Sequence, residues 1–243
     1  MHVDRRGLIG LGATLAATPA LGQAPTPAPA DPSEVHPIWP NGAPGGEAVT
    51  VAEEVHERSR DASFHDRYVT GVRRPSLTVQ RPARPNGAAV LLIPGGGYSW
   101  VVLDKEGFDI ARPLADEGVT SFVLRHRLPH QGWAAGADTP LQDAQRALRF
   151  IRGNAVRLGV DPARVGVLGA SAGGHVAASL ITRFDAPVYA RTDGADDVSA
   201  RPDFACLMYP VNLMEDPAAH RGSRDNLLGP DQSRARRDAY TPS

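Results

Sequence analysis

The sequence predicts an α/β fold whose mostly parallel sheet is covered by helices on both faces. Short, continuous apolar runs alternate with helical patterns between residues 88 and 211. A continuous apolar run suits a strand that is buried on both faces, and strand–helix alternation is typical of parallel sheets. Glycine clusters directly follow two of the runs, where the carboxyl ends of parallel strands form binding and catalytic sites.

The expected elements follow from these patterns in chain order. Residues 76–83 alternate between apolar and polar and stop at prolines, which predicts a strand near a sheet edge. The further expected strands are residues 119–127 and the apolar runs 88–94, 163–169 and 204–211. Apolar residues at helical spacing predict helices over 105–118, 139–159 and 173–184.

Composition excludes several classes of protein. The chain has 243 residues, 42% of them hydrophobic, and a net charge of −1, so a single domain with a sizeable core is expected. The sequence lacks the excess of basic residues that would indicate nucleic-acid binding. It also lacks the charge asymmetry that would indicate binding to a membrane surface. The single cysteine, Cys206, excludes an internal disulfide and a cysteine metal cluster, and its apolar neighbours predict a buried side chain. We expect no metal and no cofactor.

Residues 1–22 have the pattern of a twin-arginine export signal. An Arg5-Arg6 pair precedes a modestly apolar stretch that is too short to span a bilayer, and small residues end it. A basic tail with a chance apolar run is the alternative. Residues 23–36 are expected to be a proline-rich spacer, and residues 37–243 the folded domain. The signal implies the twin-arginine machinery as a partner, periplasmic or secreted location in a bacterium, and no membrane attachment of the mature chain.

The segment "VGVLGASAGGHVAAS", residues 165–179, joins a buried strand to a helix through Gly-x-Ser-x-Gly. A sharp strand-to-helix turn leaves room only for glycine or alanine beside Ser171, and it presents the serine hydroxyl at the sheet edge. The following N–H, that of Ala172, and the helix N-terminus point to the same place. Ser171 is therefore a candidate nucleophile; a purely structural turn is the alternative.

A second glycine cluster, "PGGG" at 94–97, ends an earlier strand. Glycines let backbone N–H groups approach a reacting atom, so Gly96 and Gly97 are candidates, with Ala172, for an oxyanion hole. The cluster lacks the lysine of a phosphate-binding loop and does not match Gly-x-Gly-x-x-Gly.

The chain resembles the α/β-hydrolase fold, and within it the carbohydrate-esterase-like branch that includes acetylxylan and feruloyl esterases. The resemblance is carried by "IWPNGAPG", "PGGGYSWVVLDKEG", "PLQDAQRALRFIR", "GVDPARVGVLGASAGGHVAAS", "RPDFACLMYPV" and "GSRDNLLG". It implies Ser171 as nucleophile, the N–H groups of Gly96, Gly97 and Ala172 as oxyanion hole, and acylated plant-wall carbohydrate as substrate. Pro94 stands where the lipase-type branch has histidine, which favours the sugar-ester branch. Tyr98 and Trp100 are expected either to face the substrate or to pack in the core or a lid.

The resemblance also implies a triad acid and histidine after the last apolar run, yet only about thirty residues follow it. We therefore expect both groups beyond residue 243, in a chain that is truncated at its C-terminus. His175 is expected to bond locally, while His220, or His126 and His130, are alternative bases.

Three other functions remain open at this point. A truncated, inactive product and a non-catalytic binding scaffold both keep the sheet without a working triad. A peptidase of the same fold is the third, although such enzymes usually carry an extra domain.

Overall fold

The computed structural model describes residues 27–243 and contains a six-stranded sheet in the order β1-β4-β7-β5-β8-β9. Strands β5, β7, β8 and β9 run parallel, and β4 and β1 continue the sheet antiparallel. The bounds are Val35–Pro37 for β1, Ser76–Gln80 for β4, Ala89–Ile93 for β5, Thr120–Arg125 for β7, Val165–Ala170 for β8 and Ala205–Met208 for β9. The predicted α/β architecture is confirmed.

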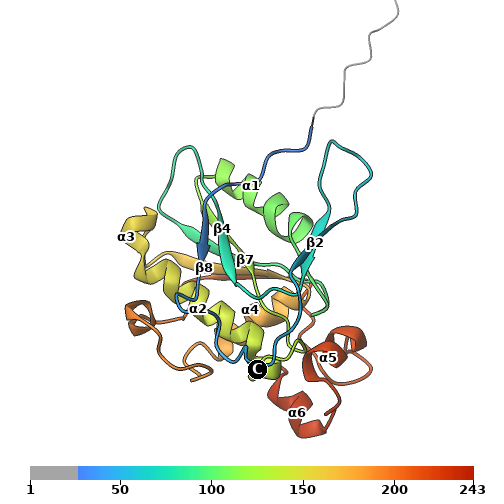
Figure 1. Cartoon of the computed structure of the whole chain (residues 1–243). Helices are drawn as coiled ribbons and strands as arrows, with labels where there is room; N and C mark the ends of the chain where they lie inside the picture. The colour runs from blue at the N-terminus through green and yellow to red at the C-terminus, as the bar shows by residue number, and fades with distance from the viewer. Residues whose placement is uncertain (1–26) are drawn as a thin grey trace, which may run out of the picture.

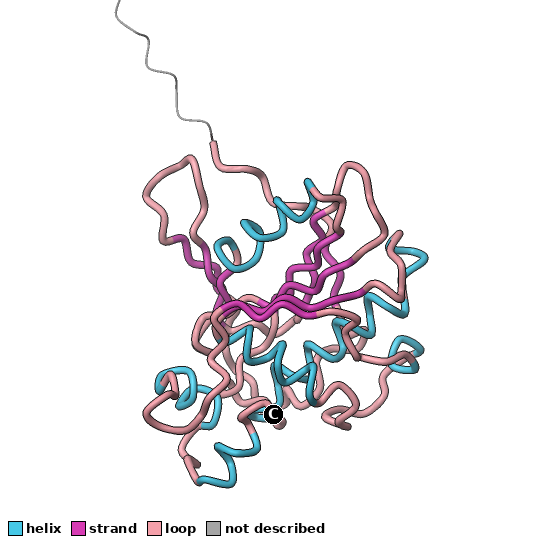
Figure 2. The backbone as a smooth tube through the Cα atoms, turned by 180° about the vertical axis from the view of Figure 1, so that it is seen from behind, coloured by secondary structure: helices cyan, strands magenta, loops and turns pink. Residues whose placement is uncertain are grey.

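Helices cover both faces of this sheet (Figures 1 and 2). One face carries α1, Asp109–Asp116, which is preceded by a π-helical turn, η1, Asp104–Phe108. The other face carries α2, Thr139–Gly153, and α4, Ala172–Thr182, with the short α3, Ala155–Leu158, following α2. The expected order of strands and helices is therefore observed from β5 to β9.

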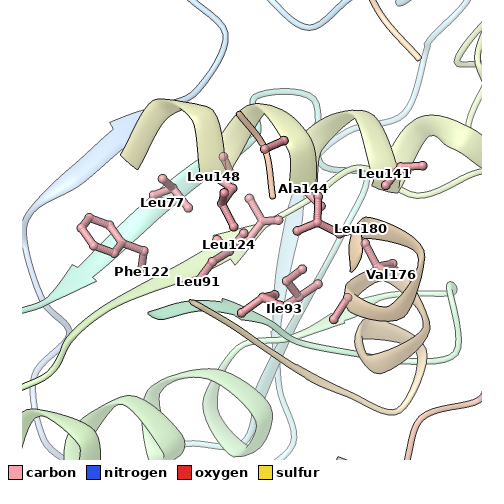
Figure 3. Close-up of a cluster of buried hydrophobic side chains, with 14 of the residues drawn as sticks. Leu77, Leu91, Ile93, Phe122, Leu124, Leu141, Ala144, Leu148, Val176 and Leu180 are labelled. Atoms are coloured by element: carbon pink, nitrogen blue, oxygen red, sulfur yellow. The ribbon is translucent and has the colours of Figure 1, made fainter. Parts of the chain in front are cut away.

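Successive strand residues point to opposite faces, and this alternation builds two cores. Leu91 and Ile93 of β5 face α2 and α4, where they meet Leu148 and Leu180 (Figure 3). Val90 and Leu92 of the same strand face α1 and η1 on the other side, in a cluster with Phe108 and Ala111. Because both faces of β5 are buried, its sequence reads as a continuous apolar run.

A second sheet of three strands was not predicted. It consists of β2, Glu54–Glu57, β3, Arg67–Thr70, and the two-residue β6, Val101–Val102. The sequence of β2 is Glu-Val-His-Glu, which has neither an apolar run nor a strong turn signal around it. Short, largely exposed strands of this kind carry little hydrophobic pattern, because few of their side chains enter a core.

The remaining elements lie in the connections. Of two 3₁₀ turns, η2 at Gly136–Asp138 directly precedes α2, and η3 at Gly194–Asp197 lies between α4 and β9. After β9, the chain forms α5, Arg221–Leu228, and α6, Arg234–Ala239 (red in Figure 1). No helix within residues 27–243 has the length and apolar character needed to cross a membrane.

The N-terminal prediction needs one correction. The expected export signal lies outside the described residues, but the expected spacer, 23–36, overlaps the sheet, because β1 begins at Val35 and pairs with β4. Two residues before that strand are also held by the domain: Glu34 pairs with Arg81, and Asp31 with Arg67. Nothing in this proline-rich stretch of the sequence predicted these two ion pairs.

Cys206 is exposed, which contradicts the prediction of a buried side chain. It lies on β9, whose residues Ala205, Cys206 and Leu207 are all exposed at the edge of the sheet. The apolar run correctly predicted a strand, but it did not predict an edge. Phe204, just before β9, is 45% exposed for the same reason.

Candidate active site

Ser171 occupies a strained turn between β8 and α4. Its φ of 53° and ψ of −120° fall in a region that residues with a side chain rarely adopt. The turn is held by backbone hydrogen bonds: the Ser171 N–H donates to Met208 O at 3.0 Å, and Ser171 O accepts from the N–H groups of His175 and Val211. Strain that neighbouring strands hold in place is typical of sites where a side chain must project from the sheet edge.

The glycines on either side of this turn are required by close backbone approach. A Cβ on Gly173 would lie 2.0 Å from Ile93 O, and a Cβ on Gly169 would lie 2.3 Å from Gly173 O. The turn therefore packs directly against the end of β5. This contact brings together the two glycine clusters that the sequence singled out.

In the loop after β5, residues 94–100, the carbonyl groups of Gly95 and Gly96 point toward the residues that follow them. Gly95 O accepts a hydrogen bond from Val102 N at 2.9 Å, and Gly96 O accepts from the N–H groups of Ser99 and Trp100. In a trans peptide the N–H points away from the preceding carbonyl, so the N–H groups of Gly96 and Gly97 face the opposite side. Within residues 27–243, neither of these two N–H groups donates a hydrogen bond.

Ala172 supplies a third free donor beside them. It is the first residue of α4, so its N–H has no partner within the helix. A Cβ on Gly95 would lie 3.0 Å from the Ala172 nitrogen, which places the loop directly against the helix N-terminus. The three N–H groups predicted for an oxyanion hole therefore belong to two segments in direct contact.

Three successive residues of this loop have left-handed backbone: Gly96 with a φ of 133°, Gly97 with 63° and Tyr98 with 61°. Tyr98 has a side chain and so carries strain there. Its ring is buried, and its hydroxyl donates to His175 Nδ1 at 2.6 Å. Of the two open alternatives for Tyr98, core packing is the one observed.

Trp100 is 38% exposed at the end of the same loop, and its ring packs against Tyr68 of β3 with centroids 5.2 Å apart. The side chain of Glu106 also holds the loop, because its carboxylate accepts a hydrogen bond from Gly95 N at 2.7 Å. Glu106 comes from η1 and also accepts from the hydroxyl of Tyr209, which follows β9.

The histidines considered as bases are all engaged elsewhere. His126 is buried and bonds Pro94 O and Arg127 O, His130 donates to Leu227 O, and His220 caps α5 through Ser223. Within residues 27–243, no histidine nitrogen is hydrogen-bonded to the Ser171 hydroxyl. In the same part of the chain, no group of three or more histidine, cysteine, aspartate or glutamate side chains could hold a metal ion.

The local bonding expected for His175 is not observed, because its hydrogen-bond partners, Tyr98 and Tyr240, lie 77 and 65 residues away in the sequence. Its Nδ1 accepts from Tyr98, and its Nε2–H donates to Tyr240 O at 2.6 Å, so both nitrogens are used by the neutral ring. Burial lowers the pKa of His175 to about 4, partly offset by the hydrogen bond to Tyr240 O. His175 therefore links the loop after β5, helix α4 and the segment that follows α6.

This pKa predicts a pH-dependent stability. The pKa of His175 is 6.5 in the unfolded chain and about 4 in the folded chain. Below pH 6.5 the unfolded chain therefore binds a proton that the folded chain does not. The free energy of unfolding is unaffected above pH 6.5 and decreases as the pH falls from 6.5 to about 4. The full loss is about 3 kcal/mol. Urea unfolding at pH 7 and pH 4.5 checks it. The matched variant His175→Gln keeps a donor and an acceptor, and should lose less stability across this interval; an equal loss in both proteins contradicts the prediction.

Two residues that contact the loop were not predicted, Glu106 and Asn226. The side-chain nitrogen of Asn226 donates to Gly97 O at 2.8 Å and to Ser99 Oγ at 2.7 Å. Both residues lie in stretches that resemble the family, "VVLDKEG" and "GSRDNLLG", and nothing else in the sequence indicated a contact with the loop. Distance along the chain hides such contacts, since Asn226 lies 129 residues after Gly97.

The chain is similar to a family model and to several known proteins. Residues 77–192 match the family model described as BD-FAE. The chain is 33% identical over 148 residues to an acetylxylan esterase of Xylanibacter ruminicola, and 37% identical over 145 residues to an endo-1,4-beta-xylanase B of Butyrivibrio fibrisolvens. These matches cover 61% and 58% of this chain, but only 28% and 22% of those two proteins. This chain therefore spans less than a third of either relative.

A solved structure gives the same fold over most of the chain. The acetyl ester-xyloside bifunctional hydrolase of Caldicellulosiruptor lactoaceticus superposes with a TM-score of 0.62 at 28% identity, covering 89% of this chain and 69% of that one. An esterase of Thermogutta terrifontis, in its apo form, superposes with a TM-score of 0.51 at 23% identity over 82% of this chain. The second likeness concerns the fold alone.

Proposed function

Since this chain has the α/β-hydrolase fold and is similar to its carbohydrate-esterase-like branch, we propose that it hydrolyses carboxylic esters. The observation that carries the proposal is the contact between the strained Ser171 turn and a loop with free N–H groups. One segment offers a hydroxyl at the sheet edge, and the other offers donors for negative charge beside it. Acyl transfer needs this combination.

In the proposed reaction, the Ser171 oxygen adds to the ester carbonyl carbon while a general base removes its proton. The N–H groups of Gly96, Gly97 and Ala172 donate hydrogen bonds to the oxyanion that forms. As this intermediate collapses, the bond to the alcohol breaks, the protonated base gives its proton to the leaving alcohol, and the acyl group stays on Ser171. The base then takes a proton from water as the water oxygen adds to the acyl carbon, and it returns this proton to the Ser171 oxygen as the acid leaves. The donors are backbone groups, fixed before the reaction, so they need no reorganisation as charge develops.

We propose acetyl or similar acyl groups on plant-wall carbohydrate as the substrate class. The support is the acetylxylan esterase and the acetyl ester-xyloside hydrolase among the similar proteins. Pro94 in place of a lipase-type histidine agrees with it. We further propose export through the twin-arginine machinery to the periplasm or the medium, on the strength of Arg5-Arg6 and the apolar stretch that follows.

The test is the substitution Ser171→Ala. Without the hydroxyl no acyl intermediate forms, so hydrolysis of 4-nitrophenyl acetate and release of acetate from acetylated xylan should fall to about the buffer rate. Ser179→Ala is the matched control, because Ser179 is a serine buried in α4 that lies eight residues after Ser171. Equal rates for Ser171→Ala and the unmodified chain would contradict the serine mechanism. Hydrolysis of 4-nitrophenyl acetate without release of acetate from xylan would contradict the proposed carbohydrate substrate.

A further inference from the structure

Three consecutive carbonyl groups of the loop after β5, those of Gly95, Gly96 and Gly97, belong to the peptide units that carry the N–H groups of Gly96, Gly97 and Tyr98. The first two, Gly95 O and Gly96 O, are held by the loop's own backbone, through Val102, Ser99 and Trp100. The third, Gly97 O, is held by a side chain from a distant element, the amide of Asn226 on α5. The backbone of the loop thus leaves one peptide unit to be fixed from outside.

That peptide unit joins two residues with left-handed backbone, Gly97 and Tyr98. A strained conformation of this kind persists only where surrounding contacts determine it. Asn226 supplies two such contacts at once, because one side-chain nitrogen donates to Gly97 O and to Ser99 Oγ. Only the amide nitrogen can serve, since a carbonyl oxygen needs a donor.

Helix α5 is a firm base for this contact. Leu227 and Leu228, the next two residues after Asn226, are almost fully buried in the main core. The Leu227 carbonyl accepts a hydrogen bond from His130 Nε2 at 3.1 Å, and the helix begins at a cap in which His220 accepts from Ser223 N. Asn226 therefore projects from a helix that is anchored on both sides of it.

We propose that Asn226 is a positioning residue that holds the loop in the shape that keeps the N–H groups of Gly96 and Gly97 free to bind an oxyanion. It touches neither Ser171 nor the reacting atoms, and acts through the Gly97–Tyr98 peptide. The consequence for catalysis rests on the function proposed above, whereas the effect on the loop does not. Segment 221–228 is then part of the catalytic architecture, although it follows all strands of the sheet.

The experiment compares Asn226→Ala and Asn226→Asp with Asp225→Ala in the full chain. Asp225 is the neighbouring, exposed residue of α5, and it contacts Arg224 rather than the loop. Both Asn226 variants remove the donor, and aspartate also places a carboxylate against Gly97 O. Amide hydrogen exchange over residues 95–103 should become about tenfold faster in both variants and stay unchanged in Asp225→Ala.

Ester hydrolysis supplies the second readout. For both Asn226 variants we expect kcat to fall about tenfold while KM stays within about twofold, because the loop is needed more in the transition state than for binding. Asn226→Gln, which keeps the amide, should recover part of the loss. A structural role alone would lower the melting temperature without this split between kcat and KM.

The exchange and kinetic results for the Asn226 variants together support or overturn the positioning role. Unchanged exchange in the Asn226 variants overturns the proposal, whatever the rates are. Faster exchange with an unchanged kcat overturns the positioning role. If the unmodified chain hydrolyses no ester, the proposed function fails, and the exchange measurement alone then decides whether Asn226 holds the loop.

Discussion

Replacing Asp143 with alanine is expected to destabilise the folded chain by about 3–5 kcal/mol, the usual cost of leaving one buried charge without its partner. Asp143 and Arg127 are both fully buried. The Asp143 carboxylate accepts hydrogen bonds from the Arg127 guanidinium, from the Arg127 N–H at 2.8 Å and from Trp39 Nε1 at 2.7 Å. The substitution removes the acceptor of Trp39 Nε1 and of the Arg127 N–H, and it leaves the Arg127 charge in the core without its carboxylate partner.

The matched control is Asp197→Ala. Asp197 forms the same kind of two-point pair with Arg191, at 2.7 and 2.8 Å, but both side chains are about 60% exposed. Solvent screens an exposed pair of this kind, so this variant should unfold almost as the unmodified chain does. Urea unfolding at pH 7 measures both. Free energies of unfolding within 1 kcal/mol of each other for the two variants would contradict the prediction.

The second large effect is expected for Gly173→Ala. The added methyl group would lie 2.0 Å from Ile93 O and 2.7 Å from the Pro94 carbonyl carbon, and both of these are backbone atoms that cannot rotate away. Either the loop after β5 or the start of α4 must move. We expect a loss of about 1–3 kcal/mol in stability, the range found for overpacked sites. Ester hydrolysis should fall at least tenfold, because the free N–H groups no longer meet Ser171.

Gly194→Ala is the control for this experiment. Gly194 begins η3, a Cβ there would meet no atom within 4 Å, and its φ is not left-handed. The control should therefore keep both stability and activity, as measured by thermal unfolding and by hydrolysis of 4-nitrophenyl acetate. Equal behaviour of the two variants would mean that the turn tolerates a side chain at Gly173.

The sequence allowed much of this fold to be predicted, because the parallel strands are buried on both faces. The runs at β5 and β8 have no polar side chain, β7 has the apolar centre Phe-Val-Leu, and the helices between them have regular periodicity. The second sheet escaped prediction because its strands are short: β2 has four mostly exposed residues, β3 has four and β6 has only two. Cys206 was placed in the core because an apolar run does not distinguish a central strand from an edge strand.

The candidate site was predictable only where chemistry is local in sequence. Gly169, Ser171 and Gly173 stand within five residues, and close packing in the turn leaves a readable pattern. Asn226 reaches the loop from 129 residues away and Glu106 from 11 residues away, beyond β6, and neither residue has sequence neighbours that indicate this role. Only a three-dimensional structure brings such residues to Gly95 and Gly97.

The exposed edge at β9 has a practical consequence for experiments. Cys206 is the single thiol of the chain, and it pairs in the sheet with Leu168 of β8, three residues before Ser171. A maleimide dye would therefore attach at one native position, with no engineered cysteine. Its fluorescence would follow events at the neighbouring turn, and would serve as an optical probe for the substitutions proposed above.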